Sequence, residues 1–502
     1  MNRAESLSRL ATEAKWDVLV IGGGATGLGT ALDAAARGYR TVLVEQGDFA
    51  KGTSSRSTKL AHGGVRYLRS GQIGFVRGAL RERGLMEHNA PHLVHRRAFV
   101  IPVYRGIDRF FFGFGLKAYE WLSGSRSFGR SRTVSTEETR RLLPTVRTEG
   151  LRGGVIYFDG QFDDARFALA LAQTATHRGA AVVNYTAVQR FVKSDGRITG
   201  AVVEDLETGN QLTIDARVVV NATGVFTDGI RRLDDSAAEP MLTVSSGVHL
   251  VLDRRFLPGD HALMVPKTSD GRVFFALPWQ GSVLIGTTDE PRDAVETEPK
   301  PLAKEIEFLL GTASAYLEKR IARSDVRSVY VGLRALVRND KAHSTSALSR
   351  DHTIVVSPSG LVTVTGGKWT TYRQMAEDTV DRAAASAGLP FQPSPTKSLR
   401  LHDGAGLEEL IRANPNLAAR LHDRLPHVAG EVVWAARHEM ARTVEDILAR
   451  RTRILFLDAR AAVECAPAVA SLLALELGRP PAWEEQQLRE FTVLAKGYIL
   501  DA

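Results

Sequence analysis

The N-terminal part of the chain alternates short apolar runs with a longer helical stretch. Residues 18–21 form an apolar run, residues 25–36 follow as a helical stretch, and residues 41–45 form a second apolar run that ends in an acid. Apolar runs joined by a helix are typical of a parallel βαβ unit, whose strands are buried on both faces. Residues 17–46 therefore predict an α/β fold built on a parallel sheet.

The hydrophobic pattern predicts further elements along the rest of the chain. We expect helices at residues 77–89, 165–178 and 304–316, and strands at residues 216–221, 326–331, 353–356 and 361–365. Residues 48–74 have the composition of an irregular loop, and residues 241–288 that of a β-rich region interrupted by Gly and Pro. From about Leu407 onward the pattern is helical, with Pro480 and Pro481 opening the last helix.

A glycine-rich turn follows the first predicted strand. Gly22, Gly24 and Gly27 have the spacing Gly-x-Gly-x-x-Gly at the start of a predicted helix, and Glu45 ends the second strand. Glycine permits a tight turn and lets backbone N–H groups approach a pyrophosphate, while the acid can bond a ribose hydroxyl. Together these residues predict a dinucleotide site. The alternative is a glycine-rich turn in another kind of α/β protein.

The rest of the chain holds no second Gly-x-Gly-x-x-Gly with its own βαβ unit. The strand that ends in Asn221, Ala222, Thr223 and Gly224 has no full phosphate-binding motif after it. We therefore expect one dinucleotide. If it is a flavin, electrons must come from an oxidisable substrate and leave to another acceptor.

Composition and charge narrow the function classes. A chain of 502 residues is long enough for about three domains. A formal net charge of +8 fits an anionic small substrate, an anionic membrane surface or nucleic acid. The arginines are spread out and no nucleic-acid motif is present, so we expect no nucleic-acid partner. The single cysteine, Cys465, allows no intrachain disulfide and suits a reducing compartment, and no zinc or calcium spacing predicts a metal.

One aromatic stretch has two interpretations. Between residues 105 and 122, apolar side chains recur near helical spacing with Arg109, Lys117 and Glu120 between them. The apolar members are Ile107, Phe110, Phe111, Phe114, Tyr119, Trp121 and Leu122. Such a face can lie in a bilayer interface or can simply pack against the protein core. No apolar signal core and no run of 18 apolar residues is present, so we expect neither export by that route nor a membrane-spanning helix.

A longer pattern makes the prediction more specific. Residues 53–68 read Thr-Ser-Ser-Arg-Ser-Thr-Lys-Leu-Ala-His-Gly-Gly-Val-Arg-Tyr-Leu, and shorter distinctive segments lie at residues 162–166, 247–249, 278–279, 285–289, 332–334, 349–351 and 366–373. With these segments nearly the whole chain resembles the FAD-dependent, quinone-linked glycerol-3-phosphate dehydrogenase family. The helical tail, with residues 439–443, looks like the C-terminal cap of that family.

The resemblance implies an architecture. We expect an α/β fold with a Rossmann-like FAD-binding domain formed discontinuously by residues 1–75, 150–235 and 346–390. A β-rich substrate-binding and membrane-facing domain would comprise residues 76–149 and 236–345, and an all-helical C-terminal cap domain residues 391–502. Family members act at the inner face of the membrane, so a cytoplasmic protein with peripheral membrane contact is expected, and a homodimer is left open.

The resemblance and the chemistry of these segments imply a set of FAD-binding residues. Hydroxyls can bond phosphate and flavin, and the pair Gly63 and Gly64 removes side chains where the backbone would pass a flat isoalloxazine ring. For His62, a place near the flavin and a purely structural role both remain open. The expected residues are Gly22, Gly24, Gly27, Glu45, Thr53, Ser54, Ser55, Thr58, His62, Gly63, Gly64, Thr223, Gly224, Gly367, Lys368 and Thr371.

The resemblance also implies a substrate site for sn-glycerol 3-phosphate. A phosphomonoester needs fixed cations, and the family pattern supplies Arg66, Arg334, Arg350 and Lys368, with Tyr67 as a hydroxyl donor and Thr287 nearby. Oxidation at C2 to dihydroxyacetone phosphate would send a hydride to flavin N5 and a proton to a base.

His249 is the expected base, because an imidazole titrates near working pH. Asp289 would orient it or bond the substrate hydroxyls, and Arg334 would stabilise the developing charge on oxygen. Electrons would pass on to a quinone. The alternative is an oxidase of the same fold that uses oxygen, acting on an amino acid or on glycerol 3-phosphate.

Two departures from the family pattern bear on the substrate site. Arg334 is followed by Ala335 where many members have Pro, which should only loosen a turn. Ser245 and Ser246 stand where some bacterial members carry a lysine, so one phosphate contact is missing. The C-terminus lacks the calcium-binding hands of the mitochondrial form, so we expect no calcium regulation.

Overall fold

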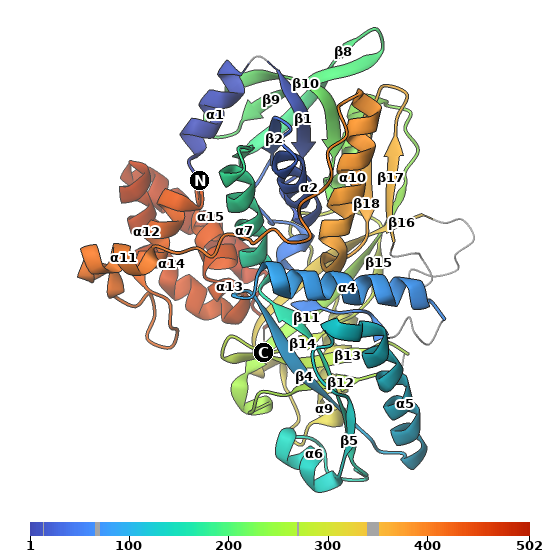
Figure 1. Cartoon of the computed structure of the whole chain (residues 1–502). Helices are drawn as coiled ribbons and strands as arrows, with labels where there is room; N and C mark the ends of the chain where they lie inside the picture. The colour runs from blue at the N-terminus through green and yellow to red at the C-terminus, as the bar shows by residue number, and fades with distance from the viewer. Residues whose placement is uncertain (14, 66–70, 269–270, 339–350, 502) are drawn as a thin grey trace.

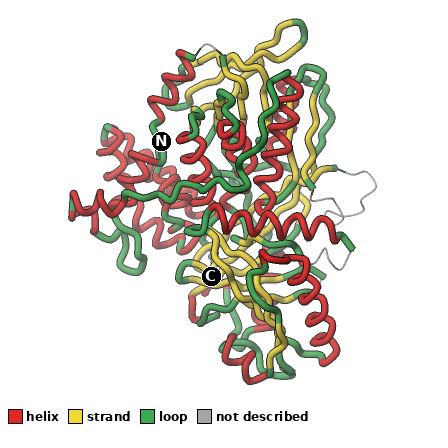
Figure 2. The backbone as a smooth tube through the Cα atoms, viewed as in Figure 1, coloured by secondary structure: helices red, strands yellow, loops and turns green. Residues whose placement is uncertain are grey.

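The computed structural model describes residues 1–13, 15–65, 71–268, 271–338 and 351–501. Two β-sheets lie one above the other in Figure 1, and a group of helices from the C-terminal part of the chain packs at their side. Coloured by secondary structure, the strands lie in the upper and lower parts of the view, and the helices at its left are the C-terminal helices labelled in Figure 1 (Figure 2).

The smaller sheet has eight strands and a parallel centre. β18, β10, β1, β2 and β7 lie side by side in parallel, β17 pairs antiparallel with β18, and β8 and β9 form an antiparallel extension from β10. Its strands are β1 (Trp16–Ile21), β2 (Thr41–Val44), β7 (Ala181–Val183), β8 (Thr186–Ser194), β9 (Arg197–Asp205), β10 (Gln211–Asn221), β17 (His352–Val356) and β18 (Val362–Gly366). α2 (Ala25–Ala36), α7 (Asp164–His177) and α10 (Tyr372–Ala387) cover one face of this sheet, and α1 (Arg3–Thr12) with the β8–β9 extension covers the other, which is why β1 is apolar along nearly its whole length.

Small side chains allow the helices to approach this sheet closely. α2 is rich in Ala and Gly and packs between α7 and α10. α7 begins where the Asp163 carboxylate accepts hydrogen bonds from the N–H groups of Ala165 and Arg166, both at 3.1 Å. α1 lies against β7, and α8 (Thr227–Asp234) follows β10.

The larger sheet has ten strands in the order β15-β11-β14-β13-β12-β4-β6-β3, with β16 also paired to β11 and β5 to β6. These strands are β3 (Leu60–Ala61), β4 (Val94–Pro102), β5 (Arg132–Val134), β6 (Gly154–Phe162), β11 (Leu242–Asp253), β12 (Ala262–Val265), β13 (Phe274–Trp279), β14 (Ser282–Gly286), β15 (Glu290–Arg292) and β16 (Val326–Val337). α9 (Ala303–Tyr316) joins the core on one face, and α4 (Ile73–Asn89) and α5 (Gly106–Ser123) contribute to the core on the other. The short α6 (Thr136–Leu142) follows β5.

The C-terminal part docks on the same face of the larger sheet as α4 and α5. Ile447, Phe456 and Cys465 share a core with Trp279 and Tyr330 of that sheet. The helices are α11 (Leu407–Ala413), α12 (Ala429–His438), the π-helix η9 (Asp446–Arg451), α13 (Ile454–Leu457), α14 (Ala459–Leu477) and α15 (Pro481–Lys496). Short 3₁₀ turns include η1 (Thr53–Ser55), η3 (Gly224–Phe226) and η7 (Trp369–Thr371).

The fold confirms the expected α/β class with a β-rich sheet and a helical C-terminal part, and α15 does begin at Pro481. The sheets divide the chain differently from the expected domain boundaries at two points, because β3 and β6 lie in ranges assigned to the FAD-binding domain but pair in the larger sheet. The helix α1 was not predicted. Among the described residues, no helix is both long and apolar enough to cross a membrane.

Candidate flavin and substrate site

The predicted dinucleotide turn lies where parallel strands of the smaller sheet end together. Ile21 of β1 pairs with Asn221 of β10, and Asn221 pairs with Thr363 of β18. The turns after β1, β10 and β18 therefore share one edge of the sheet, where α/β proteins bind their ligands. Gly22, at a φ of +112°, fits only because it has no side chain: a Cβ would lie 2.7 Å from the carbonyl oxygen of Ala222.

Because the glycines have no side chains, the backbone N–H groups at the start of α2 are accessible to a ligand. A Cβ on Gly27 would overlap the carbonyl oxygen of Gly22, and one on Gly24 would lie 3.0 Å from Ser54 Oγ. Gly24 is the N-cap of α2, and the Ala25 N–H donates to Ser54 Oγ at 2.9 Å. This is the arrangement that an anionic pyrophosphate requires, with backbone donors at a helix N-terminus and no side chain in the way.

Glu45 lies beside this turn, as the motif predicted. Its carboxylate accepts hydrogen bonds from the N–H groups of Gly23 at 2.5 Å and Gly47 at 2.7 Å. Burial raises the pKa of Glu45 despite these two donors. The side chain is therefore held at the end of β2, where a ribose would follow a pyrophosphate bound at α2.

The loop at residues 53–58 connects the two sheets. Thr53 Oγ1 donates to the Leu333 carbonyl oxygen of β16 at 2.7 Å, and the indole N–H of Trp369 donates to the Ser54 carbonyl oxygen at 2.9 Å. Ser55 is buried. Thr58 Oγ1 lies 2.9 Å from Nε2 of His249 on β11. The predicted flavin loop thus contacts the predicted catalytic histidine directly.

Gly63 is required by close packing. Its N–H donates to the Tyr119 hydroxyl at 2.7 Å, and a Cβ would lie 2.5 Å from Leu80 Cδ2. The neighbouring Gly64 has a φ of +75°. The contacts that the structure gives Gly63 are with α4 and α5, which explains a glycine here independently of any flavin. The His62 N–H donates to Thr370 Oγ1 at 3.1 Å.

His249 lies in a buried place on the larger sheet. Its ring stacks on Tyr330 of β16 with centroids 4.9 Å apart, and a Cβ on Gly286 of β14 would overlap it. Burial lowers its pKa well below the usual value, and the charges of Lys59 and Arg334 lower it further. Among the described residues, Nδ1 of His249 has no hydrogen-bond partner. The imidazole is therefore neutral at physiological pH, with one nitrogen held by Thr58.

Arg334 gathers the other predicted catalytic groups. Its guanidinium donates to the carbonyl oxygens of Ser246 at 2.8 Å and Thr288 at 2.9 Å, and to Thr287 Oγ1 at 3.2 Å. It also forms an ion pair with Asp289 at 3.3 Å. The group reaches these partners because Gly247, which has no side chain, lies beneath it. Arg334 on β16 thus forms one cluster with Thr287 and Asp289 of the β14–β15 connection, and β16 pairs with β11, which carries His249.

The remaining predicted residues are placed as follows. Thr223 Oγ1 donates to Asn221 Oδ1 at 2.7 Å, and Gly224 has a φ of +59°. Gly367, at a φ of +74°, leaves room for Met375. Lys368 Nζ lies 4.4 Å from the centre of the Phe75 ring, and Thr371 Oγ1 donates to the Lys368 carbonyl oxygen at 3.1 Å. Arg66, Tyr67 and Arg350 lie outside the described residues.

Sequence reasoning gave no role to Lys59, which is fully buried next to the site. Its ammonium donates to the Ser55 carbonyl oxygen and forms an ion pair with Asp164, both at 2.7 Å. It also lies 5.2 Å from the centre of the Tyr330 ring, whose plane is nearly parallel to that of His249. Burial lowers the pKa of Lys59 to about 7. The sequence signal for this role was a lysine within a Ser/Gly-rich loop. Its ion-pair partner, Asp164, lies over 100 residues away, so the pair could not be predicted.

Comparisons with known proteins agree with this geometry. The FAD dependent oxidoreductase family matches residues 17–373, and the C-terminal domain of alpha-glycerophosphate oxidase matches residues 362–487. The first match covers most of the chain, including both sheets, and defines an FAD-dependent oxidoreductase.

Proteins that match nearly the whole chain make the family assignment more specific. The mitochondrial glycerol-3-phosphate dehydrogenase of Arabidopsis thaliana is 41% identical over 94% of this chain and 85% of that protein. The human mitochondrial enzyme is 37% identical over 99% of this chain and 76% of its own. The crystal structure of the Bacillus halodurans glycerol-3-phosphate dehydrogenase with FAD is 31% identical, with a TM-score of 0.80 and coverage of 99% and 98%. The chain belongs to the FAD-dependent glycerol-3-phosphate dehydrogenase family.

FAD is the cofactor of this family, and the turn after β1 fits it. A Cβ at Gly22, Gly24 or Gly27 would fill the space next to the α2 N-terminus, and Glu45 stands at the end of β2. These are the features by which a Rossmann-like domain holds a dinucleotide.

Proposed function

We propose that the enzyme oxidises sn-glycerol 3-phosphate at C2 to dihydroxyacetone phosphate and passes the electrons to a quinone. One observation carries the substrate oxidation: a neutral, buried His249 contacts the 53–58 loop through Thr58 and shares its sheet with the Arg334 cluster. A base, a cation and the flavin loop are the three parts that oxidation of an alcohol to a ketone needs.

Each group has a chemical role in this proposal. Bound FAD supplies the acceptor for the hydride that leaves C2. His249 takes the proton of the C2 hydroxyl, and its low pKa keeps it unprotonated and ready to do so. Arg334 stabilises negative charge that develops on that oxygen, while Thr287 and Asp289 fix its orientation. Lys368, with Arg66, Tyr67 and Arg350, would hold the phosphate.

The proposed cofactor site comprises the turn at residues 22–27, Glu45, the loop at residues 53–64, and the turns at residues 223–224 and 367–371. All of these belong to segments that meet at, or lead from, the edge where β1, β10 and β18 end.

No second Gly-x-Gly-x-x-Gly occurs in the chain. A separate acceptor such as a quinone therefore has to take the electrons from the reduced enzyme.

A quinone acceptor favours contact with a membrane surface, and α5 offers a candidate. Its buried side is anchored by Leu116 and Tyr119, whereas the side chains of Phe114 and Trp121 are 79% and 80% exposed. These two residues are seven positions apart and so lie on the same face of the helix. Ile107, Arg109, Phe110 and Phe111, which the sequence placed in the same stretch, have side chains outside the description. We propose that this face of α5 rests in the bilayer interface of the cytoplasmic membrane leaflet.

The test of the substrate is anaerobic. We expect the flavin absorption band of the purified yellow protein to bleach with sn-glycerol 3-phosphate, and not with glycerol or a D-amino acid. His249→Gln should keep its FAD and slow the bleaching about 100-fold or more, the usual contribution of a general base. Bleaching by the amino acid alone, or equal rates in the variant, would contradict the proposal. Adding a soluble quinone or oxygen to the reduced enzyme then identifies the acceptor by the faster return of colour.

The membrane contact has its own test. We expect the Phe114→Ser, Trp121→Ser double variant to lose most of its binding to anionic lipid vesicles in a sedimentation assay while it keeps bleaching with substrate. Phe391→Ser removes a side chain of similar exposure, 73%, from the region after α10 and serves as the control. Equal binding by both variants would contradict a role for α5.

A further inference from the structure

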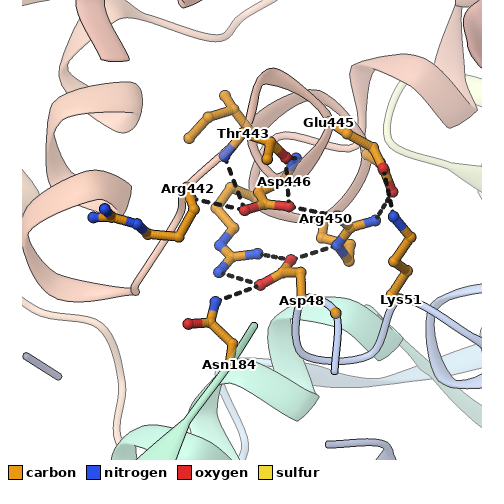
Figure 3. A network of polar contacts seen from close by, with 12 residues as sticks. Asp48, Lys51, Asn184, Arg442, Thr443, Glu445, Asp446 and Arg450 are labelled. Atoms are coloured by element: carbon orange, nitrogen blue, oxygen red, sulfur yellow. Dashed lines mark hydrogen bonds and ion pairs between the residues drawn. The ribbon is translucent and has the colours of Figure 1, made fainter. Parts of the chain in front are cut away.

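The segment between Thr443 and Arg453 carries a concentration of buried charge. Glu445, Asp446, Arg450 and Arg451 lie on or next to the π-helix η9, and Figure 3 shows Asp48, Lys51 and Asn184 of the smaller-sheet region facing them. Arg450 pairs with Glu445 and with Asp446, both at 2.7 Å. The segment is thus an ion network that joins the C-terminal helices to the N-terminal part of the chain.

The first point of contact is Asp48. Both Arg450 and Arg451 form ion pairs with its carboxylate, and Arg451 Nη2 reaches Oδ1 at 2.9 Å. Burial acts to raise the pKa of Asp48, but the two arginines outweigh it and leave the pKa lowered, so Asp48 is ionised. The nearby Lys51 forms an ion pair with Glu445 at 2.8 Å.

Asp48 stands on the turn that carries Glu45. The Gly47 N–H donates to the Glu45 carboxylate, and the Ala50 N–H donates to the Gly23 carbonyl oxygen at 2.9 Å. Residues 45–51 therefore touch the glycine turn at one end and the C-terminal arginines at the other. A displacement of Asp48 would be passed to the carboxylate expected to hold the ribose.

The second point of contact is the loop at residues 53–59. Arg453 donates to the Ser55 carbonyl oxygen at 2.8 Å and pairs with Asp164 at 3.1 Å. Asp164 also accepts hydrogen bonds from the Ser57 N–H at 3.0 Å and its hydroxyl at 2.7 Å. With Lys59 bound to the same two partners, the loop that carries Ser54 and Thr58 is fixed by charges from α7 and from the C-terminal part.

Stability alone does not require these ions. A buried ion pair adds little net stability compared with well-packed apolar side chains of the same volume, because both charges lose their hydration. What hydrogen-bonded charges add is a fixed relative position of the groups they join. Here the groups joined are two flavin-contacting segments and a helical domain some 400 residues further along the chain.

We propose that residues 445–453 are a positioning element for FAD, in which Arg450 and Arg451 hold the Glu45 turn through Asp48 and Arg453 holds the 53–58 loop through Ser55. The inference rests on the proposed assignment of Glu45 and residues 53–58 to the FAD site. It makes docking of the C-terminal domain and binding of FAD mutually dependent, since coupling between two sites is reciprocal.

The test compares two arginines of the C-terminal part that both reach the FAD-binding region. Arg451 binds Asp48, whereas Arg442 binds Glu207, next to the β9–β10 connection, at 2.5 and 2.7 Å. FAD is titrated into protein from which the flavin has been removed, with quenching of flavin fluorescence as the signal. We expect Arg451→Gln to raise the Kd for FAD about tenfold, within the usual range of coupling between sites, and Arg442→Gln to leave it unchanged.

Hydrogen–deuterium exchange gives the reciprocal readout. Addition of FAD to the unchanged protein should slow exchange at residues 439–453, and Arg451→Gln should remove that effect. If Arg451→Gln does not fold, Glu445→Gln, which removes the partner shared by Lys51 and Arg450, is used in its place. Equal Kd values for the two arginine variants, or no slowing of exchange by FAD, would overturn the proposal.

These results separate the inference from the function it rests on. Failure of the unchanged protein to take up FAD at all would overturn the assigned flavin site and this proposal with it. Failure of sn-glycerol 3-phosphate to bleach the flavin would refute the substrate and leave the comparison of Kd values standing.

Discussion

The glycine turn after β1 and the charged segment before α13 act on the same stretch of chain, residues 45–58, by opposite means. The turn works by omitting side chains, so that backbone lies against backbone at Gly22 and Gly27. The charged segment works by filling space with paired ions, such as Arg450 and Arg451 on Asp48. The glycines of the first lie within five positions of one another, although Gly22 packs against Ala222 at the end of β10. The second joins residues about 400 positions apart. The glycine motif can thus be recognised in a short stretch of sequence, whereas the ion pairs that hold residues 45–58 cannot.

The largest effect is expected where a side chain enters the glycine turn. Gly27→Ala places a Cβ on the Gly22 carbonyl oxygen, which neither backbone can avoid without distorting the turn. We expect the purified variant to contain almost no FAD, measured as the ratio of flavin to protein absorbance. Gly78→Ala, on the exposed side of α4 with no atom in the way, should keep its FAD and gain about 0.5–1 kcal/mol of stability. Normal flavin content in Gly27→Ala would show that the turn does not hold the cofactor.

The next effect distinguishes a buried ion network from an ordinary surface pair. Asp48→Asn keeps the shape of the side chain but removes the carboxylate that Arg450 and Arg451 share. Arg450 keeps Glu445 and Asp446, whereas buried Arg451 loses its closest counter-charge, which costs about 3–5 kcal/mol. We expect Tm to fall by several degrees in a thermal scan. Glu149→Gln breaks an ion pair with Arg147 in which both side chains are exposed, and should leave Tm unchanged. A similar Tm for both variants would mean that the charge of Asp48 adds nothing to the stability of the fold.

The smallest effect concerns pH. Burial, then Lys59 and Arg334, lower the pKa of His249, and a base works only when unprotonated. The rate of flavin bleaching should therefore stay constant as pH falls from 8 to about 6.5, the ordinary imidazole pKa, and decline only at lower pH. The measurement is a stopped-flow pH profile of the anaerobic half-reaction. Lys59 has a pKa of about 7, so only a decline centred well above pH 7 would argue against His249 as the base.

Most of the architecture could be predicted from local pattern. The Gly-x-Gly-x-x-Gly spacing, the apolar β1 and the helical tail each depend on neighbouring residues, and the structure confirms the fold they imply. The pairing of β3 and β6 with the larger sheet could not be predicted in the same way. β3 pairs with β6, which lies about 100 residues further along the chain, and β6 pairs in turn with β4. Pairing between such distant segments leaves no local pattern in the sequence.

In the candidate site too, residues within motifs could be predicted, and roles that depend on distant partners could not. His249, Arg334, Thr287 and Asp289 were predicted from motifs. The structure places His249 and Arg334 on neighbouring strands, with Thr287 and Asp289 in the β14–β15 connection beside Arg334. The roles of Lys59, Asp164 and Arg453 were not predicted, although two of the three lie inside or beside recognised motifs. Each owes its function to a charged partner at long range, and a single sequence carries no signal of which distant charges will meet.

The parallel pairing of β10 with β18 also determines when the smaller sheet can be completed during translation. β1 and β2 emerge from the ribosome within the first 44 residues, but β18 begins only at Val362, and Arg450 and Arg453 follow near the end. Non-local pairing waits for its last partner, however early the first one emerges. The nascent chain therefore carries an unfinished nucleotide fold through most of its synthesis. The edge of the sheet at which β1, β10 and β18 end together is therefore formed only after β18 has been made.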